Sequence, residues 1–197
     1  MDILSAAILL FLILDPLGNI PIFLSQLEKV ENRFRVLARE LLLALAILFL
    51  FLFFGKQMLD FLHLEQVSVS LAGAIILFII ALRMIFPASK QYGEEEEATQ
   101  DAPFLVPMAI PLVAGPSILA TLILLASKHP DQFDVLAIAL FIAWLLSAVI
   151  LFSATAMQKY LGKNGMIAVE RLMGMILIAI AVQMFLDGIR AFLQSVQ

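Results

Sequence analysis

Apolar residues dominate six stretches of this 197-residue chain, and short polar segments separate them. A transmembrane helix needs about 20 largely apolar residues to cross the bilayer core. The stretches cover approximately residues 3–27, 36–59, 67–86, 104–126, 135–156 and 166–192. None alternates apolar and polar residues every second position, as a membrane β-strand would. The pattern predicts an all-α membrane protein with six transmembrane helices.

The first stretch is interrupted near its centre. Asp15, Pro16, Gly18 and Pro21 follow one another within seven residues. Each proline removes a backbone donor and clashes with the preceding helical turn, and the glycine permits non-helical angles. At about 1.5 Å per residue, Asp15 lies roughly 18 Å along a helix that starts at Ile3. The sequence therefore predicts a helix broken at mid-membrane, with backbone that must be buried in protein or line a wet cavity.

The fourth stretch carries a comparable interruption. It contains Pro107, Pro111, Gly115 and Pro116. A shift of one hundred residues superimposes Pro16 on Pro116, so the two breaks coincide. An alternative is that these prolines are ordinary kinks, which membrane helices tolerate.

The coincident breaks divide the chain into two halves of three spans each. We expect repeats at residues 1–86 and 104–197, joined by an acidic linker at residues 87–103. Because three is an odd number, the second half must enter the membrane inverted relative to the first. Inverted repeats with interrupted helices at mid-membrane are a recurring transporter plan.

Basic residues are distributed unevenly between the two sides of the predicted membrane. Nine lie on one side and three on the other. Cytoplasmic loops carry the excess of lysine and arginine, so both termini are predicted to be periplasmic. The nine are Lys29, Arg33, Arg35, Arg39, Arg83, Lys90, Lys159, Lys163 and Arg171, and the three are Lys56, Lys128 and Arg190.

The composition excludes several classes of function. Hydrophobic residues make up 63% of the chain, there is no cysteine, and the two histidines are far apart in sequence. We find no nucleophile–histidine pairing, metal-ligand cluster or phosphate-binding loop, so we expect neither an enzyme nor a resident cofactor or metal. The basic residues border membrane spans, which does not support nucleic-acid binding. The expected partners are the lipid bilayer and a small-molecule substrate, and homo-oligomerisation is left open.

Asp15 is the only carboxylate that the predicted spans place deep in the membrane. An acid at that depth is costly and usually functional. The alternative is a helix cap that accepts N–H bonds from the second half-helix, and the two roles are compatible. A charged carboxylate suits Na⁺ and a protonated one carries H⁺, so Asp15 is also the candidate for a coupling ion.

The substrate is expected where the half-helices begin. Free N–H groups at a helix start favour an anionic group such as a carboxylate. The candidate substrate-binding residues are Asp15, Pro16, Gly18 and Asn19 from the first break, and Gly115, Pro116, Ser117 and Thr121 from the second.

Two motifs at these breaks resemble the signatures of a known family. The stretches Asp15-Pro16-Leu17-Gly18-Asn19-Ile20-Pro21 and Pro111-Leu112-Val113-Ala114-Gly115-Pro116-Ser117 are similar to those of the MarC family of bacterial inner-membrane proteins, which includes the SnatA neutral amino acid transporters. The resemblance covers essentially the whole chain. One departure is that Ile118 stands where the first repeat has Gly18, so the two half-sites are not equivalent.

The resemblance implies an inner-membrane, six-helix, inverted-repeat protein that moves small neutral amino acids such as glycine or alanine. Together with the two broken helices it predicts a secondary transporter whose direction is open. The alternative is a channel-like or accessory membrane protein without substrate turnover.

Overall fold

The computed structural model describes residues 2–27, 32–86 and 113–196. Within these ranges every regular element is a helix, which confirms the predicted all-α class. The elements are α1 (Ile3–Leu14), α2 (Pro16–Leu27), α3 (Arg33–Leu62), α4 (Gln66–Ile85), α5 (Pro116–Lys128), α6 (Phe133–Phe152) and α7 (Ala154–Val196). The acidic linker at 87–103 and the first part of the fourth predicted span lie outside the described residues.

Five described segments are long and apolar enough to cross a membrane. They match the first, second, third, fifth and sixth predicted spans, and the first of them runs through the predicted break. The shorter apolar helix at Ser117–Lys128 belongs to the fourth span. Many large apolar side chains on the outer faces are exposed, as they are on a surface that contacts lipid.

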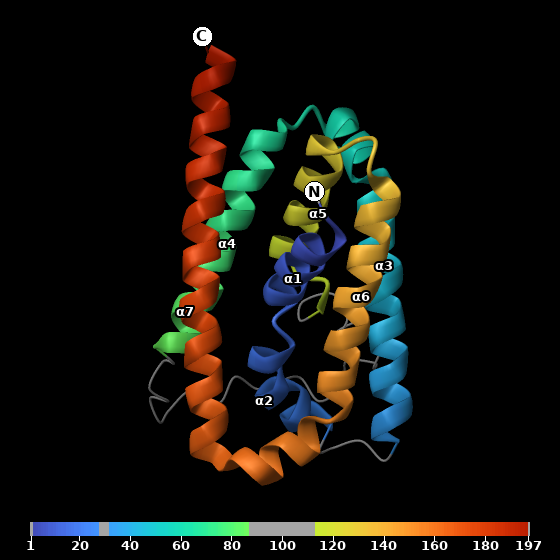
Figure 1. The fold of residues 1–197 in the computed structure, drawn as a ribbon, viewed down its shortest axis with the longest axis vertical. Helices are drawn as coiled ribbons and strands as arrows, with labels where there is room; N and C mark the ends of the chain where they lie inside the picture. The colour runs from blue at the N-terminus through green and yellow to red at the C-terminus, as the bar shows by residue number, and fades with distance from the viewer. Residues whose placement is uncertain (1, 28–31, 87–112, 197) are drawn as a thin grey trace, which may run out of the picture.

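The helices form two outer pairs around a central group (Figure 1). α4 packs along α7, and α3 packs against α6. Between these pairs lie α1 and α5 in the upper half of the view and α2 below them (Figure 1). α1 contacts α6 and α5, and α5 contacts α3 and α4. The interrupted helices therefore place their breaks in the middle of the bundle, and Asp15 at the first break is buried.

α3 and α6 run antiparallel, as aromatic contacts at both ends establish. Phe34 stacks on Phe152, with ring centroids 6.2 Å apart, and Phe53 stacks on Phe133 at 6.3 Å. The indole Nε1 of Trp144 donates a 2.8 Å hydrogen bond to the carbonyl oxygen of Leu41. This bond gives the one polar atom of a large apolar ring a partner inside the membrane.

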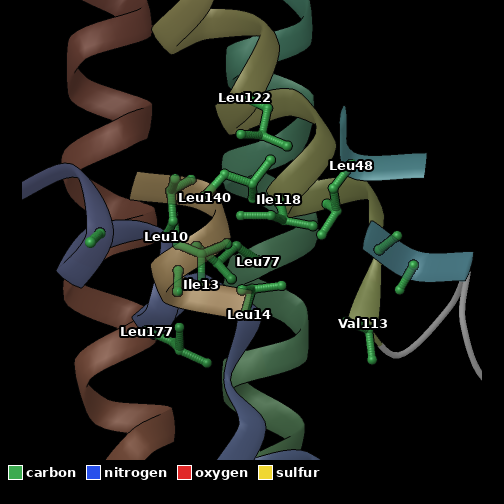
Figure 2. Packing of buried hydrophobic residues seen from close by; sticks show 14 of the residues in the cluster. Leu10, Ile13, Leu14, Leu48, Leu77, Val113, Ile118, Leu122, Leu140 and Leu177 are labelled. Carbon is green, nitrogen blue, oxygen red and sulfur yellow. The ribbon is translucent and has the colours of Figure 1, made fainter. Parts of the chain in front are cut away.

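The apolar core draws side chains from all seven described helices, and Figure 2 shows part of it. Leu10, Ile13 and Leu14 of α1 face Ile118 and Leu122 of α5, and all five are buried (Figure 2). The surrounding helices contribute Leu48, Leu77, Leu140 and Leu177. This packed shell places the breaks of the central helices inside protein.

The last helix begins earlier than the hydropathy pattern predicts. We expected a loop up to about residue 165, but α7 starts at Ala154 and includes a non-helical Gly162 with φ 65° and ψ 178°. Its first segment crosses the lower end of the bundle before the long helix rises (Figure 1). Gln158, Lys159 and Tyr160 in this segment are exposed. Hydropathy missed the segment because a polar surface helix has no apolar run.

Two glycines, one on α4 and one on α7, allow neighbouring helices to pack closely. A Cβ at Gly73 of α4 would lie 2.6 Å from Ala120 Cβ of α5, and one at Gly174 of α7 would lie 3.0 Å from the carbonyl oxygen of Ala81 of α4. Membrane helices associate through such van der Waals contacts, because lipid provides no hydrophobic driving force between them.

We expect Gly73→Leu to destabilise the folded protein by about 1–3 kcal/mol, because the side chain overpacks the α4–α5 contact. Ala72→Leu is the matched control, because Ala72 is exposed on the same helix. The measurement is thermal unfolding of the purified protein in detergent. Equal midpoints for the two variants would contradict the close α4–α5 contact.

Candidate binding cavity at the broken helices

The break in the first span is centred on Asp15. Its backbone takes φ 43° and ψ 60°, a left-handed conformation that is uncommon outside glycine but that aspartate adopts more readily than most residues. Its N–H donates to the Phe11 carbonyl oxygen at 3.1 Å, and its own carbonyl oxygen accepts from the Asn19 N–H at 3.2 Å. Asp15 therefore closes α1 and opens α2 at the same point.

Side chains satisfy backbone groups that the break exposes. The Gly18 N–H donates to Asp15 Oδ1 at 3.2 Å, and Asn19 Nδ2 donates to the Leu14 carbonyl oxygen at 3.1 Å. Pro16, the first residue of α2, has no N–H to satisfy. Asp15 is thus an N-cap of α2, a role usually worth about 1 kcal/mol.

Gly18 is required by the close approach of its neighbours. A Cβ built at this position collides with the Asp15 carboxylate and with the terminal methyl group of Met84 from α4. Any larger residue would displace the carboxylate that caps α2. The glycine therefore serves the geometry of the break through its missing side chain, and its backbone is helical within α2.

The second half-site is the start of α5. Gly115 is its N-cap residue, with φ −67° and ψ 163°, and Pro116 is its first helical residue. The Gly115 carbonyl oxygen accepts from the Leu119 N–H at 3.2 Å, and no side chain of the described residues forms a cap hydrogen bond at this end. The helix start therefore leaves a partial positive charge directed at the centre of the bundle.

A cavity of about 370 Å³ lies where these two helix starts meet. Ligand pockets usually measure about 300–1,000 Å³, so this one suits a small solute. Its wall is mostly apolar with a few polar groups. The lining residues are Ile13, Leu14, Asp15, Gly18, Asn19, Leu77, Ile80, Arg83, Met84, Val113, Gly115, Ser117, Ile118, Glu170 and Leu177.

The structure brings together most of the predicted site residues. Five of the eight line this cavity: Asp15, Gly18, Asn19, Gly115 and Ser117. Pro16 and Pro116 begin the two helices beside it. Thr121 is not among the lining residues, since its hydroxyl donates to the Ser117 carbonyl oxygen at 2.8 Å and lies 3.8 Å from the Met184 sulphur. Their role in binding stays a prediction.

Two polar side-chain atoms at the cavity can form further hydrogen bonds. Within residues 2–27, 32–86 and 113–196, Asp15 Oδ2 and Ser117 Oγ form no hydrogen bond with the protein. Asp15 thus uses one carboxylate oxygen to cap α2 and leaves the other without a hydrogen-bond partner among the described residues.

Two charged cavity residues are absent from the predicted site. Arg83 comes from the last turn of α4, and Glu170 comes from α7. Their positions near the ends of apolar stretches predict side chains at the membrane surface. The helical repeat indicates that Glu170 faces the interior of the bundle. Leu177 lies seven residues later on the same face of the helix and is buried.

Glu40, near the start of α3, is a second buried carboxylate that the sequence pattern does not single out. Glu40 is 2% exposed on the inner face of α3, between Leu37 and Leu41. Its Oε1 accepts from Arg39 Nη2 at 2.9 Å and from Arg39 Nε at 3.3 Å. Its Oε2 has no partner in the part of the chain that the structure describes. Glu40 follows a basic residue near the start of the helix, so only the packing reveals its burial.

Comparison with known proteins identifies the family. The family described as "MarC family integral membrane protein" matches residues 1–193. The chain is 50% identical to the "UPF0056 inner membrane protein YhgN" of Escherichia coli K12 over 98% of its own length and 99% of the relative's. It is 46% identical to a UPF0056 membrane protein of Buchnera aphidicola subsp. Schizaphis graminum, over 98% and 99%. A UPF0056 membrane protein of Methanocaldococcus jannaschii is 36% identical over 93% and 94%.

No solved structure matches the chain. The apolar helices and the name of the E. coli relative support the predicted location as a multi-pass protein of the inner membrane. The match over nearly the whole length confirms the family that the two break motifs suggest. The chain belongs to the MarC family of integral membrane proteins.

Proposed function

We propose that the protein is a secondary transporter for small neutral solutes, and that these are amino acids such as glycine or alanine. The observation that carries this proposal is the cavity of about 370 Å³ between the break at Asp15 and the start of α5. Substrate sites of many secondary transporters lie near the bilayer midplane and are formed by discontinuous helices.

The polar groups of the cavity suit a zwitterion. The start of α5 has no side-chain cap from the described residues and attracts a negative group. The free oxygen of Asp15 attracts a positive one. A molecule with one group of each sign and little apolar bulk matches both the charge and the volume of this space.

We also propose that the two halves are inverted repeats. The packing supports this arrangement, because exchanging α2 with α5, α3 with α6, and α4 with α7 preserves the main contacts among these helices. α2 packs on α6 as α5 packs on α3, α2 packs on α7 as α5 packs on α4, and α4 and α7 pack on each other. Rocking of one repeat against the other would then expose the cavity to each side in turn.

Asp15 is the proposed coupling residue. It is 6% exposed, lines the cavity, and keeps Oδ2 free of hydrogen bonds from the described residues. A carboxylate at this point binds either H⁺ or Na⁺ together with the substrate. An ionisable group deep in a membrane protein usually marks such an ion pathway.

Counterflow in proteoliposomes tests the transport proposal. We expect protein-dependent, saturable exchange of labelled glycine or alanine. Gly115→Leu should abolish it while folded protein is retained, because the new side chain fills the cavity. The matched control is Ala46→Leu on the exposed face of α3, which should transport as the wild type does.

The outcomes separate the candidate functions. Flux without counterflow would indicate a channel, and no flux for any amino acid would favour an accessory protein. If Gly115→Leu and Ala46→Leu transport equally well, the start of α5 is not part of the site.

We propose that both termini are periplasmic. Arg33, Arg35 and Arg83 lie at the end of the bundle opposite to the chain termini (Figure 1), and the basic end faces the cytoplasm. Reporter fusions at Gln197 should therefore be active in the periplasm, and reporters inserted at residues 94–99 in the cytoplasm. A cytoplasmic reporter at Gln197 would contradict this orientation.

A further inference from the structure

Arg83 and Glu170 line the cavity from two helices that pack side by side, α4 and α7 (Figure 1). Arg83 is exposed and Glu170 is half-buried. Among the described residues neither forms a hydrogen bond, and they form no ion pair with each other. Two opposite charges, neither with a hydrogen-bond partner among the described residues, therefore stand at the wall of a largely apolar cavity.

We propose that Arg83 binds the carboxylate of the transported amino acid and that Glu170 attracts its ammonium group, so that the two residues select zwitterions. This inference rests on the proposed transport function and assigns the specificity of the same site. The guanidinium group presents a planar fork of N–H donors that matches a carboxylate in two parallel hydrogen bonds. The start of α5 adds further positive potential to the same cavity.

The charges of the cavity favour a neutral ligand over charged analogues. Asp15 and Glu170 repel a ligand that carries only a carboxylate, and Arg83 repels one that carries only an ammonium group. A zwitterion avoids both penalties. The alternative for Arg83 is a side chain that extends along the apolar surface to the lipid headgroups, and such an arginine would not distinguish between these ligands.

The neighbouring Arg171 provides a matched control. It follows Glu170 in sequence but does not line the cavity, and it belongs to a separate groove with Asn164 and Ile167. Adjacent residues on a helix point in different directions. Arg171→Gln therefore removes the same charge as Arg83→Gln without removing a side chain from the cavity wall.

The experiment measures binding by ligand-induced thermal stabilisation of the purified full-length protein, so it does not depend on flux. The probes are alanine, alaninamide, which lacks the carboxylate, and propionate, which lacks the ammonium group. We expect the wild type to bind alanine most tightly. Arg83→Gln should weaken alanine binding at least about tenfold, the low end for a charge-assisted hydrogen bond, and leave alaninamide binding no weaker. Arg83→Lys should retain part of the affinity.

Glu170→Gln should weaken binding of alanine and alaninamide and spare propionate. The assignment would be overturned if Arg83→Gln bound alanine as tightly as the wild type, or if Arg171→Gln lost as much alanine affinity as Arg83→Gln. A wild type that binds none of the probes would also overturn it. Each variant is first compared with the wild type by its unfolding midpoint without ligand. If Arg83→Gln does not fold and Arg83→Lys binds alanine as the wild type does, the wild type alone provides the test. Equal affinity of the wild type for alanine and for alaninamide then overturns the inference. Counterflow with the wild type tests transport separately, so failure of this inference leaves that proposal standing.

Discussion

A backbone that leaves the helical conformation inside a membrane must find partners for its polar groups within the protein, and this requirement organises the whole structure. Hydrocarbon provides neither donors nor acceptors, so each unsatisfied group costs several kcal/mol. The break at Asp15 meets the requirement locally, through the Gly18–Asp15 and Asn19–Leu14 hydrogen bonds. The remaining helices then enclose it: α1 and α2 contact both α6 and α7, which belong to different outer pairs, and α1 also contacts α5.

Enclosure alone would give a sealed core, but the two helix starts leave space between them. α1 and α2 meet at an angle set by the left-handed Asp15, and α5 begins only at Pro116. Neither end has a side chain that fills the gap, since Gly18 and Gly115 have none. The cavity follows from the same residues that break the helices, and the polar atoms of the break become its polar lining.

The sequence predicts features that local chemistry determines. The five long spans follow from apolar length, and the break at Asp15 and the start of α5 follow from proline and glycine, whose effects act within a turn of the chain. Most candidate site residues come together because they belong to these breaks. The burial of Glu40 and the cavity positions of Arg83 and Glu170 are not predictable in this way. Each depends on which face of a long helix a neighbouring helix covers, and the weak amphipathicity of membrane helices carries little information on that point.

The central claim is that Asp15 both caps α2 and carries the charge that couples transport to a cation. Asp15→Asn separates the two roles, because asparagine keeps an oxygen that accepts from the Gly18 N–H but loses the titratable charge. The measurement is uphill uptake into proteoliposomes under an imposed H⁺ or Na⁺ gradient, beside exchange at zero gradient. Asp15→Asn should exchange substrate but fail to accumulate it, and Asp15→Ala should also lose about 1 kcal/mol of stability with the cap. Accumulation by Asp15→Asn equal to that of the wild type would contradict the claim and leave Asp15 as a helix cap alone.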